Sequence, residues 1–407
     1  MDAELQLENA KRYALANHPK GQAYDPIRPL PADARSDKKL RIGYFSADFH
    51  QHATAFLISE LFERHDKNRF EVIAYSCGVP DGSAEEARIK NSVSLFRDIR
   101  TMDNHSAANL IRQDGIDIMV DLKGYTRGER MDVLALRPAP IQMHYLGYPG
   151  TTGAPFIDYF IADHITAPEG SDAFFSERLI RLPHCYQIND RKRPLFGPLP
   201  SSAQSRASYG LPNKGFVFCD FNNSYKITPE MFAVWMRLLA AVPGSVLWLY
   251  ETHAEATANL RSVAKKHGID PARLIPATTA PLAQHLARYR HVDVFLDTAP
   301  VCGHTTASDA LWCGVPVVTL AVQSFVSRVA ASLLHAVELP ELAAADLTSY
   351  EALALELAHD PKKLEQLKQH LESGRMRFPL FDSAGTTQAL ETAYEQAATR
   401  HRAGLAP

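Results

Sequence analysis

The sequence predicts an α/β protein made of two Rossmann-like domains. Short β-branched or aromatic runs alternate with amphipathic stretches from about residue 40 onward, which is the pattern of parallel sheets covered by helices. A segment rich in proline, serine and charge interrupts this pattern at residues 189–212. The chain has 407 residues, and a single core usually stops growing at roughly 250–300 residues. Two domains joined by a linker are therefore expected.

The first series of elements alternates regularly between strands and helices. Strands are expected at residues 41–46, 71–76, 117–121, 142–146 and 159–162, with helices at 53–65, 84–91 and 104–113. The second series has expected strands at residues 216–221, 246–250, 292–296 and 315–320, with helices at 229–241, 255–267 and 281–290.

These elements divide the chain into five parts. The expected parts are an N-terminal helical segment (1–37, with a proline-containing stretch at 26–31), a first Rossmann-like domain (38–190), a linker (191–212), a second Rossmann-like domain (213–382) and a C-terminal helix (383–407). The abrupt start with a helix leads us to expect a further module upstream.

Composition excludes several classes of protein. The formal net charge is -3, so a nucleic-acid backbone is not the expected partner. No apolar run reaches the roughly 18–20 residues that a membrane helix needs. The five cysteines are scattered and form no C-x-x-C pair, which is typical of free thiols in a reducing compartment. A cytoplasmic protein that binds neither nucleic acid nor membrane is expected.

A glycine-containing turn gives the strongest local signal. Gly303, His304, Thr305 and Thr306 follow the expected strand 292–296 and open a helix. The free N–H groups and the dipole at such a helix start bind phosphate, and the threonine hydroxyls add donors. Asp309, one turn further on, is placed to accept from a ribose hydroxyl. The alternative is an ordinary threonine-capped helix.

A lysine follows the first strand of the second series. Lys226 lies in the loop after residues 216–221, and ligands of open α/β sheets bind outside the carboxyl ends of strands. A lysine there neutralises a leaving phosphate as a point charge. The alternative is a solvated loop lysine, which the expected closeness of Lys226 to Thr305 disfavours.

Two titratable residues follow the first strand of the first series. Asp48 and His52 stand between the strand 41–46 and the helix 53–65. Histidine is suited to taking a proton from a hydroxyl near neutral pH. The alternative is that Asp48 caps the helix and His52 packs in its first turn.

The motifs of other nucleotide-binding proteins are absent from the sequence. The glycine-rich stretches 123–128 and 146–153 follow strands, yet neither matches the dinucleotide pattern G-x-G-x-x-G, and no P-loop is present. No H-E-x-x-H or C-x-x-C pattern indicates a metal. Two Rossmann-like halves without these motifs favour a sugar nucleotide over NAD or ATP.

Several of these motifs resemble the catalytic region of the O-linked N-acetylglucosamine (O-GlcNAc) transferases. The similarity runs in order from about residue 38 to about residue 395, and the runs at 135–151 and 303–306 are the most specific. The motifs are RIGY (41–44) with Asp48 and His52, ALRPAPIQ (135–142), LGYPGT (146–151), Tyr225-Lys226, GHTT (303–306) and SRVAAS (327–332).

The resemblance implies a GT-B fold, in which two Rossmann-like domains face a central cleft. It implies a donor substrate, UDP-GlcNAc, and inverting transfer to serine or threonine hydroxyls of a protein or peptide acceptor. It implies no metal and no other cofactor. Members of the family carry helical TPR repeats upstream, which agrees with the abrupt start of this chain.

The resemblance also assigns roles to residues. Lys226 would stabilise the leaving UDP, and His52 or Asp48 would take the hydroxyl proton, with a donor phosphate oxygen or a water chain as the other candidates. The donor would be bound by Asn223, Tyr225, Lys226, His285, Arg288, Gly303, His304, Thr305, Thr306 and Asp309. The sugar and acceptor pocket would be formed by Thr54, Leu146, Gly147, Tyr148 and Pro149.

Some residues depart from the family pattern. Leu282 stands where the family has a lysine on the uridine side, Val301-Cys302 replaces a cysteine-asparagine pair, and Asn223 replaces the usual glutamine of the animal enzymes. The large insert between the halves of the animal enzymes is absent. The alternatives are therefore a GT-B transferase with another nucleotide sugar or acceptor, and a non-catalytic module that binds a UDP-sugar. An NAD-dependent oxidoreductase would need the missing glycine fingerprint.

Overall fold

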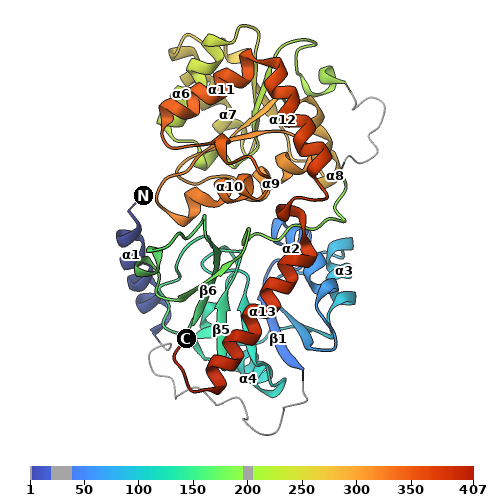
Figure 1. Ribbon diagram of the computed structural model, residues 1–407, viewed down its shortest axis with the longest axis vertical. Helices are drawn as coiled ribbons and strands as arrows, with labels where there is room; N and C mark the ends of the chain where they lie inside the picture. The colour runs from blue at the N-terminus through green and yellow to red at the C-terminus, as the bar shows by residue number, and fades with distance from the viewer. Residues whose placement is uncertain (1, 20–38, 196–204) are drawn as a thin grey trace. The chain divides into compact units, whose positions relative to one another are not determined.

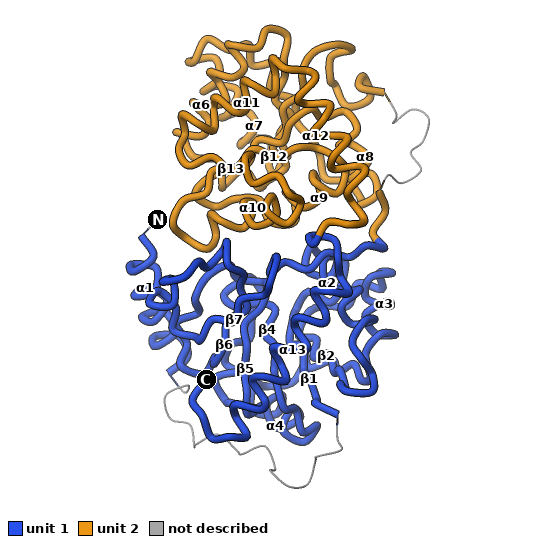
Figure 2. Tube along the Cα trace, viewed as in Figure 1, with its two compact units in different colours: residues 1–192, 379–407 blue, residues 193–378 orange. Residues whose placement is uncertain are grey.

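The structure is a computed structural model that describes residues 2–19, 39–195 and 205–407 (Figure 1). The chain forms two compact units, which Figure 2 shows in different colours. Unit 1 comprises Met1–Lys192 and Pro379–Pro407, and unit 2 comprises Arg193–Phe378. The expected proline-containing stretch 26–31 and part of the expected linker, residues 196–204, lie outside the described residues.

Unit 1 is built on a seven-stranded sheet in which every paired strand runs parallel. The strand order is β3-β2-β1-β4-β5-β6-β7, so the chain first builds outward from β1 and then returns to its other side. The strands are β1 (Leu40–Ser46), β2 (Phe70–Ser76), β3 (Leu95–Asp98), β4 (Ile118–Asp121), β5 (Ile141–His144), β6 (Tyr159–Asp163) and β7 (Arg178–Leu182).

Helices cover this sheet, and the last helix of the chain is one of them. Tyr394 on that helix donates to or accepts from Tyr44 of β1 at 3.0 Å, and Glu391 pairs with His65 at 3.0 Å. The C-terminal helix therefore completes the core of unit 1. The helices are α1 (Ala3–Asn17), α2 (Ala53–Arg64), α3 (Ala84–Ser92), α4 (Asn104–Gln113), α5 (Met131–Ala135) and α13 (Ser383–Arg402).

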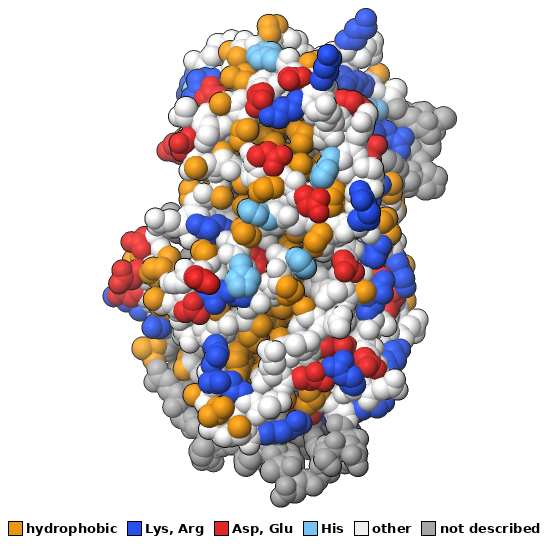
Figure 3. Space-filling view, in the orientation of Figure 1, with side chains coloured by type: hydrophobic (Ala, Val, Ile, Leu, Met, Phe, Trp, Pro, Cys, Tyr) orange, Lys and Arg blue, Asp and Glu red, His pale blue; other side chains and the backbone are white. Residues whose placement is uncertain are grey.

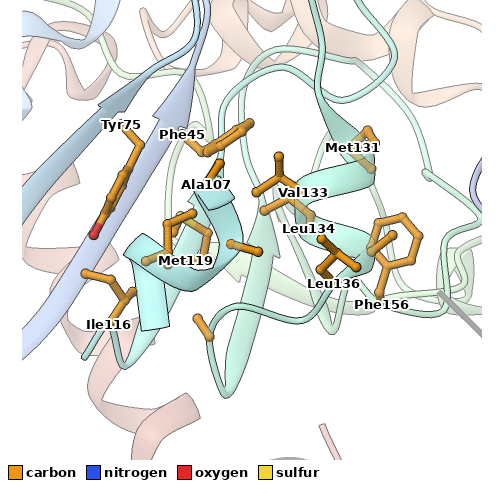
Figure 4. Packing of buried hydrophobic residues seen from close by; sticks show 14 of the residues in the cluster. Phe45, Tyr75, Ala107, Ile116, Met119, Met131, Val133, Leu134, Leu136 and Phe156 are labelled. Carbon is orange, nitrogen blue, oxygen red and sulfur yellow. The ribbon is translucent and has the colours of Figure 1, made fainter. Parts of the chain in front are cut away.

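A hydrophobic cluster joins the sheet of unit 1 to α4 and α5. Phe45 and Met119 from the sheet pack with Ala107 of α4 and Leu134 of α5, all fully or almost fully buried (Figure 4). The strands β1 and β4 are thus held from one face by close-packed apolar side chains.

Unit 2 repeats the same architecture with a six-stranded parallel sheet. Its strand order is β10-β9-β8-β11-β12-β13. The strands are β8 (Val217–Asp220), β9 (Val246–Tyr250), β10 (Leu274–Ala277), β11 (Val294–Leu296), β12 (Val317–Leu320) and β13 (Ala343–Ala344). The helices are α6 (Pro229–Ala241), α7 (Ala254–Lys266), α8 (Leu282–Arg288), α9 (Thr305–Trp312), α10 (Phe325–His335), α11 (Leu347–His359) and α12 (Pro361–Gly374).

The surface agrees with the low net charge. On the face shown in Figure 3, basic and acidic side chains are interspersed over each unit, and the described residues form no broad basic patch there. No helix in the described part of the chain is long and apolar enough to cross a membrane. The cysteines are free thiols, and all but the half-buried Cys77 are buried.

Candidate functional site

Both sheets have a topological switch point between their two central strands. The connections leaving β1 and β4 in unit 1, and β8 and β11 in unit 2, run to opposite sides of the sheet. Ligands of doubly wound folds bind outside the carboxyl ends of such strand pairs. Asp48 and Lys123 follow the pair in unit 1, while Lys226 and Gly303 follow the pair in unit 2.

In unit 2, Gly303 stands at a position where neighbouring side chains leave no room for a Cβ atom. Its N–H donates to Asp297 Oδ1 at 2.6 Å. A Cβ atom on Gly303 would lie 2.8 Å from Thr306 Oγ1 and 3.0 Å from Asp297 Oδ1. The turn before α9 therefore needs glycine, and it leads directly to Thr305, the first residue of the helix.

A buried polar network fixes this turn, and the sequence reasoning did not identify its two central residues. Asn222 donates to Asp297 Oδ1 at 3.0 Å and accepts from Thr306 Oγ1 at 2.5 Å. Thr319 on β12 donates to the second oxygen of Asp297 at 2.7 Å. Burial raises the pKa of Asp297 to about 6, although the hydrogen bonds from Thr319 and Gly303 and the charge of Lys226 oppose the shift. Both Asn222 and Asp297 follow central strands, which is the signal that could have revealed them.

Lys226 and His304 lie beside this turn. Lys226 ends a short 3-10 helix, Ser224–Lys226, and its Nζ donates to the carbonyl oxygen of Cys302 at 2.9 Å. Burial and the charge of Lys226 lower the pKa of His304 to about 3. His304 Nε2 is buried and has no hydrogen-bond partner among the described residues. The arrangement gives a neutral imidazole and an ammonium group next to the free N–H groups of a helix start, which suits an anion.

The predicted uridine-side residues pack on an aromatic cluster. His285 lies edge-on to Phe221 at 5.4 Å and to Tyr289 at 5.4 Å between ring centroids. Burial and then Arg288 lower the pKa of His285 to about 4, so its ring is neutral. Arg288 is buried and its Nε has no hydrogen-bond partner among the described residues. An unpaired guanidinium N–H beside aromatic rings is a donor for a ligand.

The remaining predicted donor residues differ in exposure. Asn223 is half-buried and precedes the Lys226 turn, while the side chain of Tyr225 is 77% exposed. Asp309 is buried, and its Oδ1 accepts from Arg193 Nη1 at 2.7 Å. The guanidinium of Arg193 also lies over the Trp312 ring at 4.9 Å. The structure therefore places the proposed ribose acceptor in an ion pair with a residue that was expected to belong to the linker.

In unit 1, His52 is the capping residue of α2. Its Nδ1 accepts from the N–H of Thr54 at 3.2 Å and lies 3.4 Å from Asp48 Oδ2. The structural alternative, in which Asp48 caps the helix, is thus wrong, because the cap is His52 itself. Lys123 Nζ donates to the same Asp48 oxygen at 2.7 Å. Lys123 was not among the expected site residues, although it opens one of the glycine-rich stretches.

The loop 146–149 has a strained backbone. Leu146 has φ of 70°, a value that a non-glycine residue rarely adopts. A side chain on Gly147 would lie 2.1 Å from the carbonyl oxygen of Leu122. Pro149 and Tyr148 are half-buried next to this backbone.

A buried histidine, His144, is hydrogen-bonded to the backbone of this loop. His144 donates from Nε2 to the carbonyl oxygen of Tyr148 at 2.8 Å and from Nδ1 to Asp121 Oδ2 at 2.9 Å. Because a carbonyl and a carboxylate both accept, the ring carries both protons. Burial opposes this charge, yet the bond to Asp121 outweighs it and raises the pKa of His144.

Within unit 2, the structure brings Lys226, Gly303, His304 and Thr306 together around one turn. Within unit 1, it brings Asp48, His52 and Thr54 together at the start of α2. The described residues include no group of three or more His, Cys, Asp or Glu side chains arranged to hold a metal ion.

Two parallel-sheet Rossmann-like units, each with polar residues after its central strands, are the architecture of the GT-B class of glycosyltransferases. Solved structures agree with the fold: Anabaena HepE, determined with UDP and glucose, matches with a TM-score of 0.59 at 13% identity over 88% of this chain and 100% of that one. The chain belongs to glycosyl transferase family 41, whose model matches residues 24–203 and 197–390.

Individual relatives agree with this assignment. A mutant O-GlcNAc transferase of Thermobaculum terrenum superposes with a TM-score of 0.88 and is 31% identical, over 99% of this chain and 75% of that one. The probable UDP-N-acetylglucosamine–peptide N-acetylglucosaminyltransferase SEC of Arabidopsis thaliana is 39% identical over 91% of this chain. The corresponding Caenorhabditis elegans transferase is 30% identical over 98% of it. The chain spans 38% and 45% of the length of these two relatives.

Proposed function

We propose that the chain is an inverting glycosyltransferase that moves N-acetylglucosamine from UDP-GlcNAc to serine and threonine hydroxyls of proteins. The relatives named above as UDP-N-acetylglucosamine–peptide transferases support the donor and the acceptor class. The observation that carries the proposal is the position of Lys226, whose ammonium group lies 2.9 Å from the carbonyl oxygen just before the Gly303 turn.

The proposed chemistry is a single displacement at the anomeric carbon. The acceptor oxygen forms a bond to this carbon while the bond from the carbon to the diphosphate oxygen breaks, and its electron pair leaves with UDP. The hydroxyl proton passes to Nε2 of His52 in the tautomer that carries the ring proton on Nδ1. In this tautomer Nδ1 donates to Asp48, 3.4 Å away, in place of accepting from Thr54. Partial burial is the main cause that lowers the pKa of His52, so the ring is neutral and able to accept near pH 7.

Negative charge develops on the diphosphate in the transition state. Lys226 and the N–H groups that open α9 are fixed in place before the reaction, by the Cys302 carbonyl and by the Asn222 network. Preorganised donors of this kind supply the largest share of electrostatic catalysis. With a lysine and a helix start at the phosphates, the proposed reaction needs no metal ion and no other cofactor.

The proposal extends to the context of the protein. We infer that the acceptor is a protein or peptide, that TPR repeats lie upstream of the region described here, and that the protein works in the cytoplasm without binding nucleic acid. The two relatives named above are more than twice as long as the region that this chain matches, which supports an additional module in proteins of this family.

The decisive experiment measures UDP release from a panel of UDP- and GDP-sugars in the presence of EDTA, with an acceptor peptide mixture. We expect release from UDP-GlcNAc, and a loss of about 10²–10³-fold in the Lys226→Ala variant, the size typical of removing one preorganised transition-state donor. The matched control is Lys214→Ala, which removes an exposed lysine of the same unit.

Three outcomes would overturn parts of the proposal. Release from a GDP-sugar alone would refute the donor, and tight UDP binding without release from any donor would favour a binding module. Loss of activity in EDTA that added metal restores would refute the metal-free reaction.

A further inference from the structure

Unit 1 contains a buried lysine that the reaction proposed above does not use. Lys123 follows β4, its side chain is only 4% exposed, and its Nζ lies 2.7 Å from Asp48 Oδ2 after β1. Ion pairs that are taken out of water stabilise a fold little, because the desolvation penalty offsets the attraction. The position of Lys123 is therefore better explained by the effect of its charge and hydrogen bond on Asp48 than by a contribution to the stability of the fold.

The loop around Lys123 is built to hold this position. Its backbone N–H donates to Asp121 Oδ1 at 3.1 Å, and the next N–H, of Gly124, donates to the other Asp121 oxygen at 2.7 Å. The carbonyl oxygen of Lys123 accepts from Thr126 Oγ1 at 2.9 Å. The backbone of Lys123 is thus fixed on both sides, and its ammonium group is directed to Asp48.

The carboxylate oxygen that Lys123 binds also faces the histidine. Asp48 Oδ2 lies 3.4 Å from His52 Nδ1, and the same nitrogen lies 3.2 Å from the N–H of Thr54. If Nδ1 accepts from Thr54, the ring proton sits on Nε2, which then cannot take a proton. If Nδ1 donates to Asp48, Nε2 is free to accept. An ionised Asp48 favours the tautomer with the proton on Nδ1, in which Nε2 can accept.

Charges around His52 come from several elements. Burial lowers the pKa of His52, Asp48 raises it, and Lys123 and His50 lower it, with a net lowering. His50 itself lies 3.9 Å from Asp81. Lys123 is the cation in direct contact with Asp48.

We propose that Lys123 is a positioning residue, which holds Asp48 where it orients His52 and offsets the charge of Asp48 so that the ring stays neutral. The inference rests on the proposed function, in which His52 Nε2 takes the proton of the acceptor hydroxyl. Removing Lys123 leaves the full charge of Asp48 next to His52, so the ring holds its proton to higher pH. Removing the charge of Asp48 has the opposite effect.

The test compares Lys123→Met, Lys123→Arg and Asp48→Asn in the full chain. The titration of His52 is followed by NMR on ¹⁵N-histidine-labelled protein, with the signal assigned by its loss in His52→Gln. For Lys123→Met we expect the midpoint of the His52 titration to rise by about one pH unit. This is the low end of the pKa shift that a nearby charge causes, and we expect the low end because the His52 side chain is 43% exposed. For Asp48→Asn we expect a lower midpoint, and for Lys123→Arg a midpoint near the starting value. Lys67→Met, an exposed lysine of the same unit, is the matched control.

The pH dependence of UDP release gives the second readout. The acidic limb of kcat/KM should move to higher pH in Lys123→Met and to lower pH in Asp48→Asn, whereas a purely structural role would lower activity equally at every pH. An unchanged His52 midpoint in Lys123→Met, with UDP release intact in the original chain, would overturn the inference and leave the proposed function standing. If Lys123→Met does not fold, the Asp48→Asn titration decides, and an unchanged midpoint there overturns it as well. Absence of UDP release from the original chain would instead refute the proposed function, while the NMR titration would still report on Lys123.

Discussion

Replacing Arg193 with methionine should destabilise unit 2 in a pH-dependent manner. The side chains of Arg193 and Asp309 are 2% and 6% exposed and lie 2.7 Å apart. Burial raises the pKa of Asp309 from 3.8 to about 6 even though Arg193 opposes the shift. A pKa shift of about two units corresponds to about 3 kcal/mol. Above pH 6, burial of the ionised Asp309 carboxylate therefore lowers the stability of the fold by about this amount.

The sign follows from linkage. A carboxyl whose pKa is raised on folding lowers stability as the pH rises through the interval between its unfolded and folded values. Without Arg193 the folded pKa of Asp309 rises further, so more stability is lost at pH 7.5. Breaking a buried ion pair from one side typically costs about 3–5 kcal/mol. At pH 5 the carboxyl of the variant is protonated, and only the lost packing on Trp312 remains, about 1–2 kcal/mol.

The tryptophans make the assay specific for unit 2. The chain has three tryptophans, Trp235, Trp248 and Trp312, and all belong to Arg193–Phe378. Urea unfolding followed by tryptophan fluorescence at pH 5 and pH 7.5 therefore reports on this unit. Arg375→Met is the control, since Arg375 also lies over Trp312, at 5.6 Å. A loss below 1 kcal/mol at pH 7.5, or an equal loss at both pH values, would refute the argument from charge.

Two further predictions concern the backbone of unit 1. Because the pKa of His144 is raised, its bonds to Asp121 and to the loop 146–149 stabilise the fold below about pH 6.5 and weaken as the pH rises through the pKa of the folded state. Hydrogen exchange of this loop, corrected for intrinsic rates, should therefore increase from pH 6 to pH 8.5. The His144→Gln variant should lose this pH dependence. Gly153→Ala should displace α1, because the new Cβ would lie 2.3 Å from backbone atoms of α1, and this helix should become sensitive to protease. Gly170→Ala is the control, since Gly170 also has a positive φ but a Cβ there would meet nothing within 4 Å, so α1 should stay protected. Equal cleavage of both variants would contradict the role of the contact between Gly153 and α1.

The fold could be predicted from the sequence because the central strands carry unambiguous patterns. The central strands β1, β4, β8 and β11 are almost wholly buried and consist mostly of apolar residues, and each predicted strand overlaps an observed one. The strands that were not predicted, β3, β7, β10 and β13, are the edges of the two sheets. Edge strands are partly exposed and mix charges or proline with apolar residues, so their periodicity is weak.

The candidate residues could be selected from the sequence, but the partners that hold them could not. Residues after central strands are recognisable from position alone, and Lys226, Gly303 and His52 were identified in this way. The pairs that hold them depend on which distant loops meet: Asn222 reaches Asp297 across 75 positions of sequence, and Asp48 reaches Lys123 across the same number. Such contacts follow from the strand order, which a single sequence does not specify.

The buried ionic pairs next to the candidate residues point to a common principle. Lys123 with Asp48 and Arg193 with Asp309 each place a full charge at a position where desolvation offsets most of the attraction. Replacing both partners of such a pair by apolar residues of similar size is often neutral or stabilising, whereas removing one partner is not. Each pair instead fixes a carboxylate that belongs to the proposed site, and a fixed carboxylate keeps its geometry when a substrate binds. The arrangement thus exchanges stability for preorganisation, which is the property that electrostatic catalysis requires.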